Sequence, residues 1–223
     1  MLSGAGVSQE SGLQTFRDSD GLWMGYNVYE VASPEGWKKD PESVLQFYNQ
    51  RRKEVAKALP NEAHKAIADL ERNFNVTVIT QNIDDLHERA GSENVLHLHG
   101  EIFKMRSEKD EHTVYEIKED IQFGQKAPDG FQLRPHVVWF GEQVPNIIKA
   151  KLIMAEADIF VLVGTSLQVY PASGLIDYLP SGTPKYIIDK NPPYIPAHHN
   201  FFVIKKSATE GMQDLKKLLI ENN

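Results

Sequence analysis

An apolar run, Val76-Thr77-Val78-Ile79, leads directly into Thr80-Gln81-Asn82-Ile83-Asp84, and a second run, Val95-Leu96-His97-Leu98, leads into His99-Gly100. Each run is predicted to be a buried strand that delivers polar groups at its C-terminal end. In open α/β sheets, ligands bind in the crevice at that edge of the sheet. An amide, a carboxylate and an imidazole that converge there are typical of a reaction site rather than of a packed core.

Strand and helix patterns alternate through most of the chain. The predicted core strands are Met1–Ser3, Val76–Thr80, Val95–Leu98, Ile159–Gly164, Tyr186–Asp189 and Phe201–Ile204. The predicted helices are Glu42–Leu59, His64–Asn73, Asp84–Ala90, Ile147–Glu156, Ser173–Leu179 and Gly211–Glu221. Val- and Ile-rich strands that alternate with helices indicate an α/β fold with a Rossmann-like, doubly wound parallel sheet.

Two stretches interrupt this alternation. Residues 26–73 are mostly helical and are predicted to form a small cap, whereas residues 104–134 are polar and contain the turn Pro128-Asp129-Gly130. Apolar residues alternate with polar ones on both sides of that turn (Ile121 and Phe123, Phe131 and Leu133), which predicts a hairpin. Residues 1–25, 74–103 and 135–223 are then expected to form the main domain.

Composition excludes several classes of function. The 223 residues carry a net charge of −7, so the chain lacks the basic surface of a nucleic-acid-binding protein. Its apolar runs are shorter than the roughly 20 residues that span a bilayer. The absence of cysteine excludes disulfides, thiolate zinc sites and a cysteine nucleophile. We expect a cytoplasmic monomer that binds neither nucleic acid nor membrane.

A glycine turn, Gly4-Ala5-Gly6, follows the first predicted strand. Such a turn lets the backbone approach a pyrophosphate, although it can also be only a tight connection. The dehydrogenase fingerprint expects an acidic residue about 20 positions later, at the end of a second strand. Residues 21–25 show no strand pattern, which disfavours hydride transfer. Arg17 can reach a phosphate with Asp18 orienting it, or the two can be an ordinary surface pair.

Six motifs in order make the chain resemble the sirtuins, which are NAD-dependent protein lysine deacylases. They are Gly4–Ser8, Thr15–Asp18, Thr80–Asp84, Leu98–Gly100, His136–Glu142 and Gly164–Leu167. Sirtuins cleave the bond between nicotinamide and ribose, and the acyl group of a modified lysine is transferred to ADP-ribose. The resemblance therefore implies NAD as cofactor and acylated lysine proteins or peptides as partners.

The resemblance also assigns roles to residues. It makes His99 the base, a task that suits a group titrating near neutrality, and Asn82 its catalytic companion. The cofactor-binding residues that it implies are Gly4, Ala5, Gly6, Ser8, Phe16, Arg17, Gln81, Asn82, Ile83, Asp84, Gly164, Thr165, Ser166, Asp189 and Ala208. Asp189 stands where the family usually has an Asn. Val138 and Phe140 match the segment that pairs with substrate backbone as an added strand, and a buried core strand is the alternative.

One pair bears on the acyl group that is removed. Tyr48 and Arg51 are three residues apart in a predicted helix and so share a face. The sirtuin subset that removes malonyl and succinyl groups carries Tyr-x-x-Arg at this place, and a guanidinium beside a phenol suits a carboxylate. The alternative is a solvent-facing Arg, since Arg52 and Lys53 make this stretch basic.

The metal site departs from the family pattern. Sirtuins commonly hold zinc on four cysteines between the catalytic histidine and the Val-Trp-Phe-Gly segment, and this chain has none. His112 with Asp110 and Glu111 is poor ligand geometry, so we expect no metal. A hairpin and a small apolar cluster are predicted instead; its members are Tyr115, Ile117, Ile121, Phe123, Phe131 and Leu133.

Two other functions remain open at this stage. An NAD-dependent mono-ADP-ribosyltransferase would use the same scaffold, with a protein nucleophile in place of the acyl oxygen. A catalytically silent module that binds NAD or acyl-lysine is the third possibility.

Overall fold

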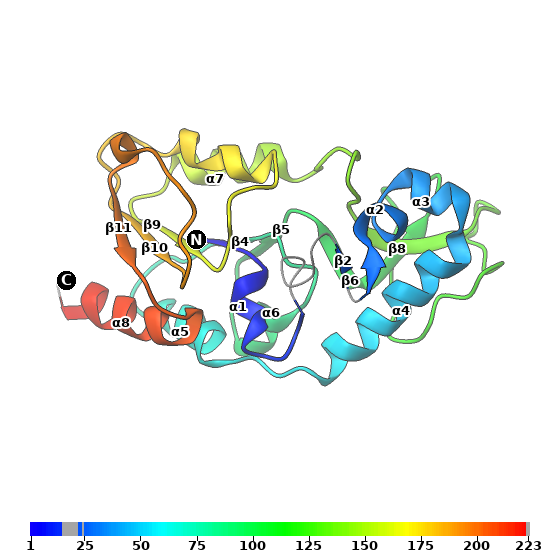
Figure 1. The fold of residues 1–223 in the computed structure, drawn as a ribbon, viewed down its shortest axis with the longest axis horizontal. Coiled ribbons are helices and arrows are strands. Elements are labelled where there is room, and N and C mark those ends of the chain that lie inside the picture. The colour runs from blue at the N-terminus through cyan, green and yellow to red at the C-terminus, as the bar shows by residue number, and fades with distance from the viewer. Residues whose placement is uncertain (15–21, 24, 222–223) are drawn as a thin grey trace.

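A six-stranded parallel sheet forms the centre of the computed structural model, which describes residues 1–14, 22–23 and 25–221 (Figure 1). Its strands are β1 (Leu2–Ser3), β4 (Val78–Thr80), β5 (Val95–His97), β9 (Phe160–Val163), β10 (Lys185–Ile188) and β11 (Phe201–Ile204). They lie in the order β11-β10-β9-β1-β4-β5, and every neighbouring pair is parallel. Numbered along the chain, this is the 3-2-1-4-5-6 order of a doubly wound dinucleotide-binding sheet. The predicted fold class is confirmed.

Helices cover both faces of this sheet (Figure 1). On one face, α5 (Glu62–Leu70) packs with α8 (Ala208–Glu221), and on the other α7 (Ile147–Ala155) packs with η2 (Ala172–Tyr178), a 3₁₀ helix. The four residues of β9 alternate between these two cores: Val161 and Val163 join the first, whereas Phe160 and Leu162 join the second. Burial on both faces explains why this strand is an uninterrupted apolar run.

A second unit lies beside the sheet (Figure 1). Three helices, α2 (Val28–Val31), α3 (Pro34–Lys39) and α4 (Pro41–Lys57), share one apolar core with an antiparallel sheet. That sheet has the order β7-β6-β8, where β6 is Gly100–Ser107, β7 is Val114–Glu116 and β8 is Leu133–Val137. Proline at the first helical position and a side-chain cap, from Ser33 and Asp40 respectively, start α3 and α4.

The remaining elements are short. They are α1 (Ala5–Gln9), β2 (Leu22–Trp23), β3 (Tyr26–Asn27), α6 (Leu86–Ala90) and η3 (Ala197–His199). Among the described residues, no helix has the length and apolar character needed to cross a bilayer. The α1 helix begins directly after β1, and α6 follows the loop that leaves β4. Both short helices therefore start at the edge of the sheet where the predicted site lies.

The predicted hairpin is shorter in the structure than the sequence indicated. A short antiparallel hairpin does surround the turn at residues 128–130, with the isolated bridge between Lys126 and Gln132 and a hydrogen bond of 2.8 Å from Ala127 N to Phe131 O. Leu133, however, pairs with Ser107 of β6. Phe123 and Phe131 are 61% and 45% exposed, so they do not join the apolar cluster that was expected to hold them. The other four members of that cluster are buried or half-buried against the core: Tyr115, Ile117, Ile121 and Leu133.

Helix α5 also differs from its predicted place. It falls within residues 26–73, yet its buried residues, among them Ile67 and Leu70, pack against α8 and the parallel sheet. The cap that packs on the small sheet therefore comprises α2, α3 and α4. The predicted helix Ser173–Leu179 is the 3₁₀ helix η2.

Candidate active site

The candidate site is a cleft of about 790 Å³ at the C-terminal ends of the parallel strands. It lies where the strand order reverses, between β1 and β9, and this crevice is the usual ligand site of such sheets. Two backbone hydrogen bonds join its walls, from Gly4 N to Val163 O (3.2 Å) and from Gly6 N to Gly164 O (2.8 Å).

Glycine is required at the closest approach of these two walls. Gly164 has a φ of +61°, and a Cβ placed there would lie 2.4 Å from the backbone nitrogen of Val7. A Cβ on Gly6 would lie 2.8 Å from the Cα of Gly164. Bare backbone therefore lines this part of the cleft, and a side chain at Gly6 or Gly164 would force the two walls apart.

A buried hydrogen-bond network follows β4. Ser8 Oγ donates to Asp84 Oδ2 (3.0 Å) and accepts from Asn82 Nδ2 (3.1 Å). Leu86 N donates to the other carboxylate oxygen of Asp84 at 3.2 Å. Burial raises the pKa of Asp84, while the hydrogen bonds from Ser8 and Leu86 oppose that effect. The network fixes the Asn82 and Asp84 side chains in one orientation at the cleft wall.

His99 has the geometry of a neutral base. Its Nδ1 lies 3.0 Å from the carbonyl oxygen of Gln81, and an oxygen of that kind only accepts, so Nδ1 carries the proton. Burial lowers the pKa of His99, and the hydrogen bond to Gln81 offsets only part of that effect. The neutral imidazole therefore keeps Nε2 as an acceptor in the cleft that His99 lines.

His97 also hydrogen-bonds to the loop that follows β4. Its Nδ1 lies 2.9 Å from the Asn82 carbonyl oxygen, and its Nε2 lies 2.7 Å from Glu88 Oε1. Burial lowers the pKa of His97, but the hydrogen bond and charge of Glu88 outweigh burial and raise it overall. His97, at the end of β5, and His99, just after it, thus hydrogen-bond to the consecutive carbonyl groups of Asn82 and Gln81.

Arg51 also lines the cleft and is a buried cation. Only 6% of it is exposed, and its guanidinium lies 5.5 Å from the Trp23 ring centroid. Nη2 donates to Gln14 O (3.2 Å) and Nη1 lies 3.6 Å from Glu54 Oε2. Within the described ranges, its Nε has no hydrogen-bond partner. Burial lowers the pKa of Arg51, so an anion in this cleft would relieve an unfavourable environment.

Tyr48 lies on the same helix, one turn before Arg51, and also lines the cleft. It is fully buried, and its Oη accepts a hydrogen bond of 3.0 Å from Trp139 Nε1. Burial raises the pKa of Tyr48, so the phenol stays protonated across the neutral range.

Every described residue of the predicted site lines this one cleft. They are Gly4, Ala5, Gly6, Ser8, Tyr48, Arg51, Gln81, Asn82, Ile83, Asp84, His99, Val138, Phe140, Gly164, Thr165, Ser166, Asp189 and Ala208. Phe16 and Arg17 lie outside the described residues. Gln81 Nε2 donates to Thr165 Oγ1 (2.9 Å), which links the loops after β4 and β9.

The segment expected to pair with substrate is already hydrogen-bonded within the chain. Val138 N donates to His99 O and Phe140 N to Ala32 O, each at 2.9 Å. Backbone pairing with a substrate would therefore use carbonyl groups of this segment. Sequence reasoning missed Trp23, Ala32 and Trp139 as lining residues. Trp139 lies inside the motif His136–Glu142, so its place in that motif could have indicated that it lines the cleft.

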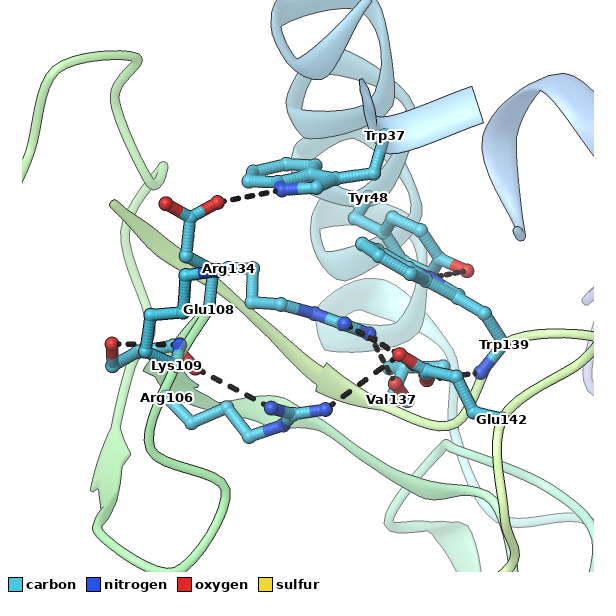
Figure 2. A network of polar contacts seen from close by, with 10 residues as sticks. Trp37, Tyr48, Arg106, Glu108, Lys109, Arg134, Val137, Trp139 and Glu142 are labelled. Carbon is cyan, nitrogen blue, oxygen red and sulfur yellow. Dashed lines mark hydrogen bonds and ion pairs between the residues drawn. The ribbon is translucent and has the colours of Figure 1, made fainter. Parts of the chain in front are cut away.

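The small sheet does not fit a zinc ion. Zinc modules of the sirtuin kind need thiolates, and the chain has no cysteine. The described residues contain no group of three or more His, Asp or Glu side chains that could hold a metal. Figure 2 shows a polar network in this region instead, in which Arg134 binds both carboxylate oxygens of Glu142, at 2.7 and 3.2 Å.

The comparisons with known proteins agree with this geometry. The sequence model described as "Sir2 family" matches residues 4–171. The chain belongs to the Sir2 family. It is 51% identical to a protein of Bacteroides thetaiotaomicron named NAD-dependent protein deacylase, over 99% of this chain and 97% of that protein. A Helicobacter pylori protein of the same name is also 51% identical, with coverages of 99% and 96%.

Solved structures of the Sir2 family share the fold. A Sir2 homologue in complex with NAD superimposes with a TM-score of 0.88 at 38% identity, covering 99% of this chain and 88% of that one. A mutant Sir2 homologue in complex with ADP-ribose gives a TM-score of 0.89 at 38% identity, with coverages of 99% and 91%.

Proposed function

We propose that this Sir2-family chain is an NAD-dependent protein lysine deacylase that removes acidic acyl groups, succinyl and malonyl, as well as acetyl. The observation that carries the acidic-acyl part is Arg51, a buried guanidinium in the same cleft as His99 and Asn82, whose Nε has no hydrogen-bond partner among the described residues. The names of the Bacteroides and Helicobacter relatives support the deacylase part.

The cleft residues fit NAD. Glycine at positions 6 and 164 lets the backbone of the two cleft walls meet closely, and Thr165 and Ser166 add hydroxyl groups beside them. These groups would hold the phosphates, while Asp189 and Ala208 would lie toward the adenosine. Asn82 and Asp84 would hold the ribose and the nicotinamide amide, whose NH₂ is a donor that a carboxylate accepts. Bound NAD supplies the nicotinamide leaving group and the ADP-ribose that accepts the acyl group.

His99 then acts as the general base. A sugar hydroxyl must lose its proton before it can attack the activated acyl group, and Nε2 of neutral His99 can accept that proton. The hydrogen bond from Nδ1 to the Gln81 carbonyl orients the ring and stabilises the charge that the ring acquires. The buried network of Ser8, Asn82 and Asp84 keeps the neighbouring wall fixed, so little reorganisation accompanies the reaction.

Arg51 and Tyr48 would bind the carboxylate of a succinyl or malonyl group. In the part of the chain that the structure describes, Arg51 Nε is a donor without a partner, and Tyr48 offers a phenol that stays protonated. An acetyl group has no carboxylate, so it would leave the Arg51 charge buried without a further anion. The preference for acidic acyl groups would therefore come from this pair.

The test compares peptides that differ only in the lysine modification. Purified chain is incubated with NAD and succinylated, acetylated or unmodified peptide, and nicotinamide release and peptide mass are followed. Arg51→Met should lower kcat/KM for the succinyl peptide about 10- to 100-fold more than for the acetyl peptide, as expected for a charged hydrogen bond. Lys53→Met is the matched control, because Lys53 is an exposed cation of the same helix that pairs with Asp120 at the surface.

Each other outcome contradicts a defined part of the proposal. Equal losses on both peptides would refute the carboxylate role of Arg51. With radiolabelled NAD in the same incubation, label that stays on protein without deacylation would indicate a mono-ADP-ribosyltransferase. If no peptide causes nicotinamide release, the chain would be a module that binds NAD or acyl-lysine without catalysing a reaction.

A further inference from the structure

Trp139 is aimed at the acyl end of the cleft. Its side chain is 2% exposed, and its Nε1 donates to Tyr48 Oη at 3.0 Å. An indole N–H can only donate, so Tyr48 accepts in this bond and its own proton is not used there. The bond therefore restricts the directions in which the Tyr48 hydroxyl can point that proton.

The Trp139 ring is held on both sides (Figure 2). The Arg134 guanidinium lies 3.2 Å from the Trp139 ring centroid, and the Trp37 ring lies tilted at 5.6 Å. Glu142 Oε2 accepts the backbone N–H of Trp139 at 2.8 Å, and the same carboxylate binds Arg134 with both oxygens. Arg134 also donates to Val137 O at 2.9 Å, which ties this clamp to β8.

Arg106 adds a second cation beside Glu142. Its Nη2 lies 3.9 Å from Glu142 Oε1, and Nη1 donates to Ser107 O at 3.3 Å. Two arginines of the small sheet, one on β6 and one on β8, thus face one carboxylate. Because Glu142 also accepts from the Trp139 backbone, the position of the indole depends on the small antiparallel sheet.

We propose that Trp139, clamped by Arg134 and Glu142, is a positioning residue for acyl selectivity: its indole N–H turns the Tyr48 hydroxyl proton into the cleft, where it joins Arg51 on the acyl carboxylate. The inference rests on the proposed function and deepens it, because it names the residue that makes Tyr48 a donor. Without the indole N–H, the Tyr48 hydroxyl can rotate about its C–O bond, and its proton points toward the acyl carboxylate for only part of the time.

The deciding variant is Trp139→Phe, which keeps an aromatic ring for Arg134 to stack on and removes only the N–H and one ring. The measured quantity is the ratio of kcat/KM for succinyl peptide to kcat/KM for acetyl peptide. We expect that ratio to fall about tenfold. The loss should fall on KM for the succinyl peptide, because the carboxylate is bound equally in ground state and transition state.

Trp37→Phe is the matched control. Trp37 is also buried and lies against the Trp139 ring, but its Nε1 donates to Glu108 Oε2 at 3.0 Å and not to Tyr48. It should leave the selectivity ratio unchanged. In a double-mutant cycle, Trp139→Phe should have no further effect on the ratio once Tyr48→Phe has removed the hydroxyl.

A second variant decides the matter if Trp139→Phe fails to fold, as judged by its thermal unfolding. Arg134→Lys keeps the charge but loses the bidentate contact and the planar stack, so it should lower the same ratio by a smaller factor. A folded variant of either kind that keeps the wild-type ratio would overturn the inference.

Failure of this inference can be told apart from failure of the proposed function. If Arg51→Met lowers the ratio and Trp139→Phe does not, the carboxylate site stands and the role of Trp139 is refuted. If the wild type does not turn over succinyl peptide, the acidic-acyl part of the proposed function fails, and the inference fails with it.

Discussion

Replacing His64 with Gln should reduce the loss of stability that acid causes. His64 is fully buried on α5, where its Nδ1 accepts the backbone N–H of Asn61 at 3.3 Å and its Nε2 lies 3.5 Å from Ser8 Oγ. Its ring meets the ring of His87 at 5.0 Å. Burial lowers the pKa of His64 from 6.5 to about 4, so the folded protein keeps this imidazole neutral in mild acid.

The direction of the pH effect follows from proton uptake. Below pH 6.5 the unfolded chain protonates His64 and the folded chain does not, so the contribution of this group is full above 6.5 and is lost as pH falls toward 4. Over about 2.5 pH units, at about 1.36 kcal/mol each, the free energy of unfolding falls by about 3 kcal/mol. For a chain of this size that corresponds to a Tm lower by about 6 to 12 °C.

Two neighbouring histidines act in opposite directions. Burial places the pKa of His87 well below 6.5, so His87 adds to the acid sensitivity. The pKa of His97 is raised overall, so its contribution is present below its unfolded pKa and is lost as pH rises through the folded value. Both groups are present in the two proteins compared. Replacing His64 also removes its charge effect, which lowers the pKa of His87, so the two changes act in the same direction.

The measurement is Tm as a function of pH between 7.5 and 4.5 for wild type, His64→Gln and His112→Gln. A glutamine can accept from Asn61 and donate to Ser8 without gaining charge in acid, so its Tm should fall less steeply. His112 is exposed, and its variant should follow the wild type. Parallel curves for wild type and His64→Gln would refute the reasoning.

Further outcomes are expected at the site. His99→Tyr should lower kcat for deacylation at least 100-fold, by mass spectrometry of the peptide, and a retained rate would remove its role as base. Because the pKa of His99 is lowered, the acid limb of kcat/KM should lie below pH 6.5, and a limb above that value would argue against a neutral base. Gly164→Ala should weaken NAD binding measured by calorimetry, since its Cβ would lie 2.4 Å from Val7 N; an unchanged Kd would contradict the close approach. Elemental analysis should find no stoichiometric zinc, and one zinc per chain would show that ligands have been missed.

The sheet could be predicted because its signal is local. Residues such as Val161 and Leu162 are buried on opposite faces, so β9 is apolar at every position, and polar groups after such a strand mark the binding edge. Strand β6 was missed for the opposite reason. Lys104 and Arg106 alternate with apolar residues in it, which makes the segment polar overall, and one of its two partners, β8, lies far along the chain.

Among the residues that line the cleft, those in local motifs could be predicted, whereas contacts between distant segments could not. His99 and Asn82 stand at strand ends in short motifs, and the structure brings them to one cleft. The bond between Trp139 and Tyr48 joins residues 91 positions apart, and no pattern within either segment indicates it. The place of α5 was missed likewise, because its amphipathic pattern fits either core, and only its packing against α8 decides between them.

The central strand β1 can complete its pairing only late in synthesis, because its two neighbours lie far along the chain. Leu2 of β1 pairs with Ile79 on one side and with Leu162 on the other. A nascent chain therefore holds one open flank of β1 until position 162 has left the ribosome, and pairing over such spans is slow and exposed to misassociation. Premature termination before that point yields a fragment in which one edge of β1 is unpaired and the β9 wall of the cleft is missing. Such a fragment would be bound by chaperones or degraded by proteases and would not act as a smaller enzyme.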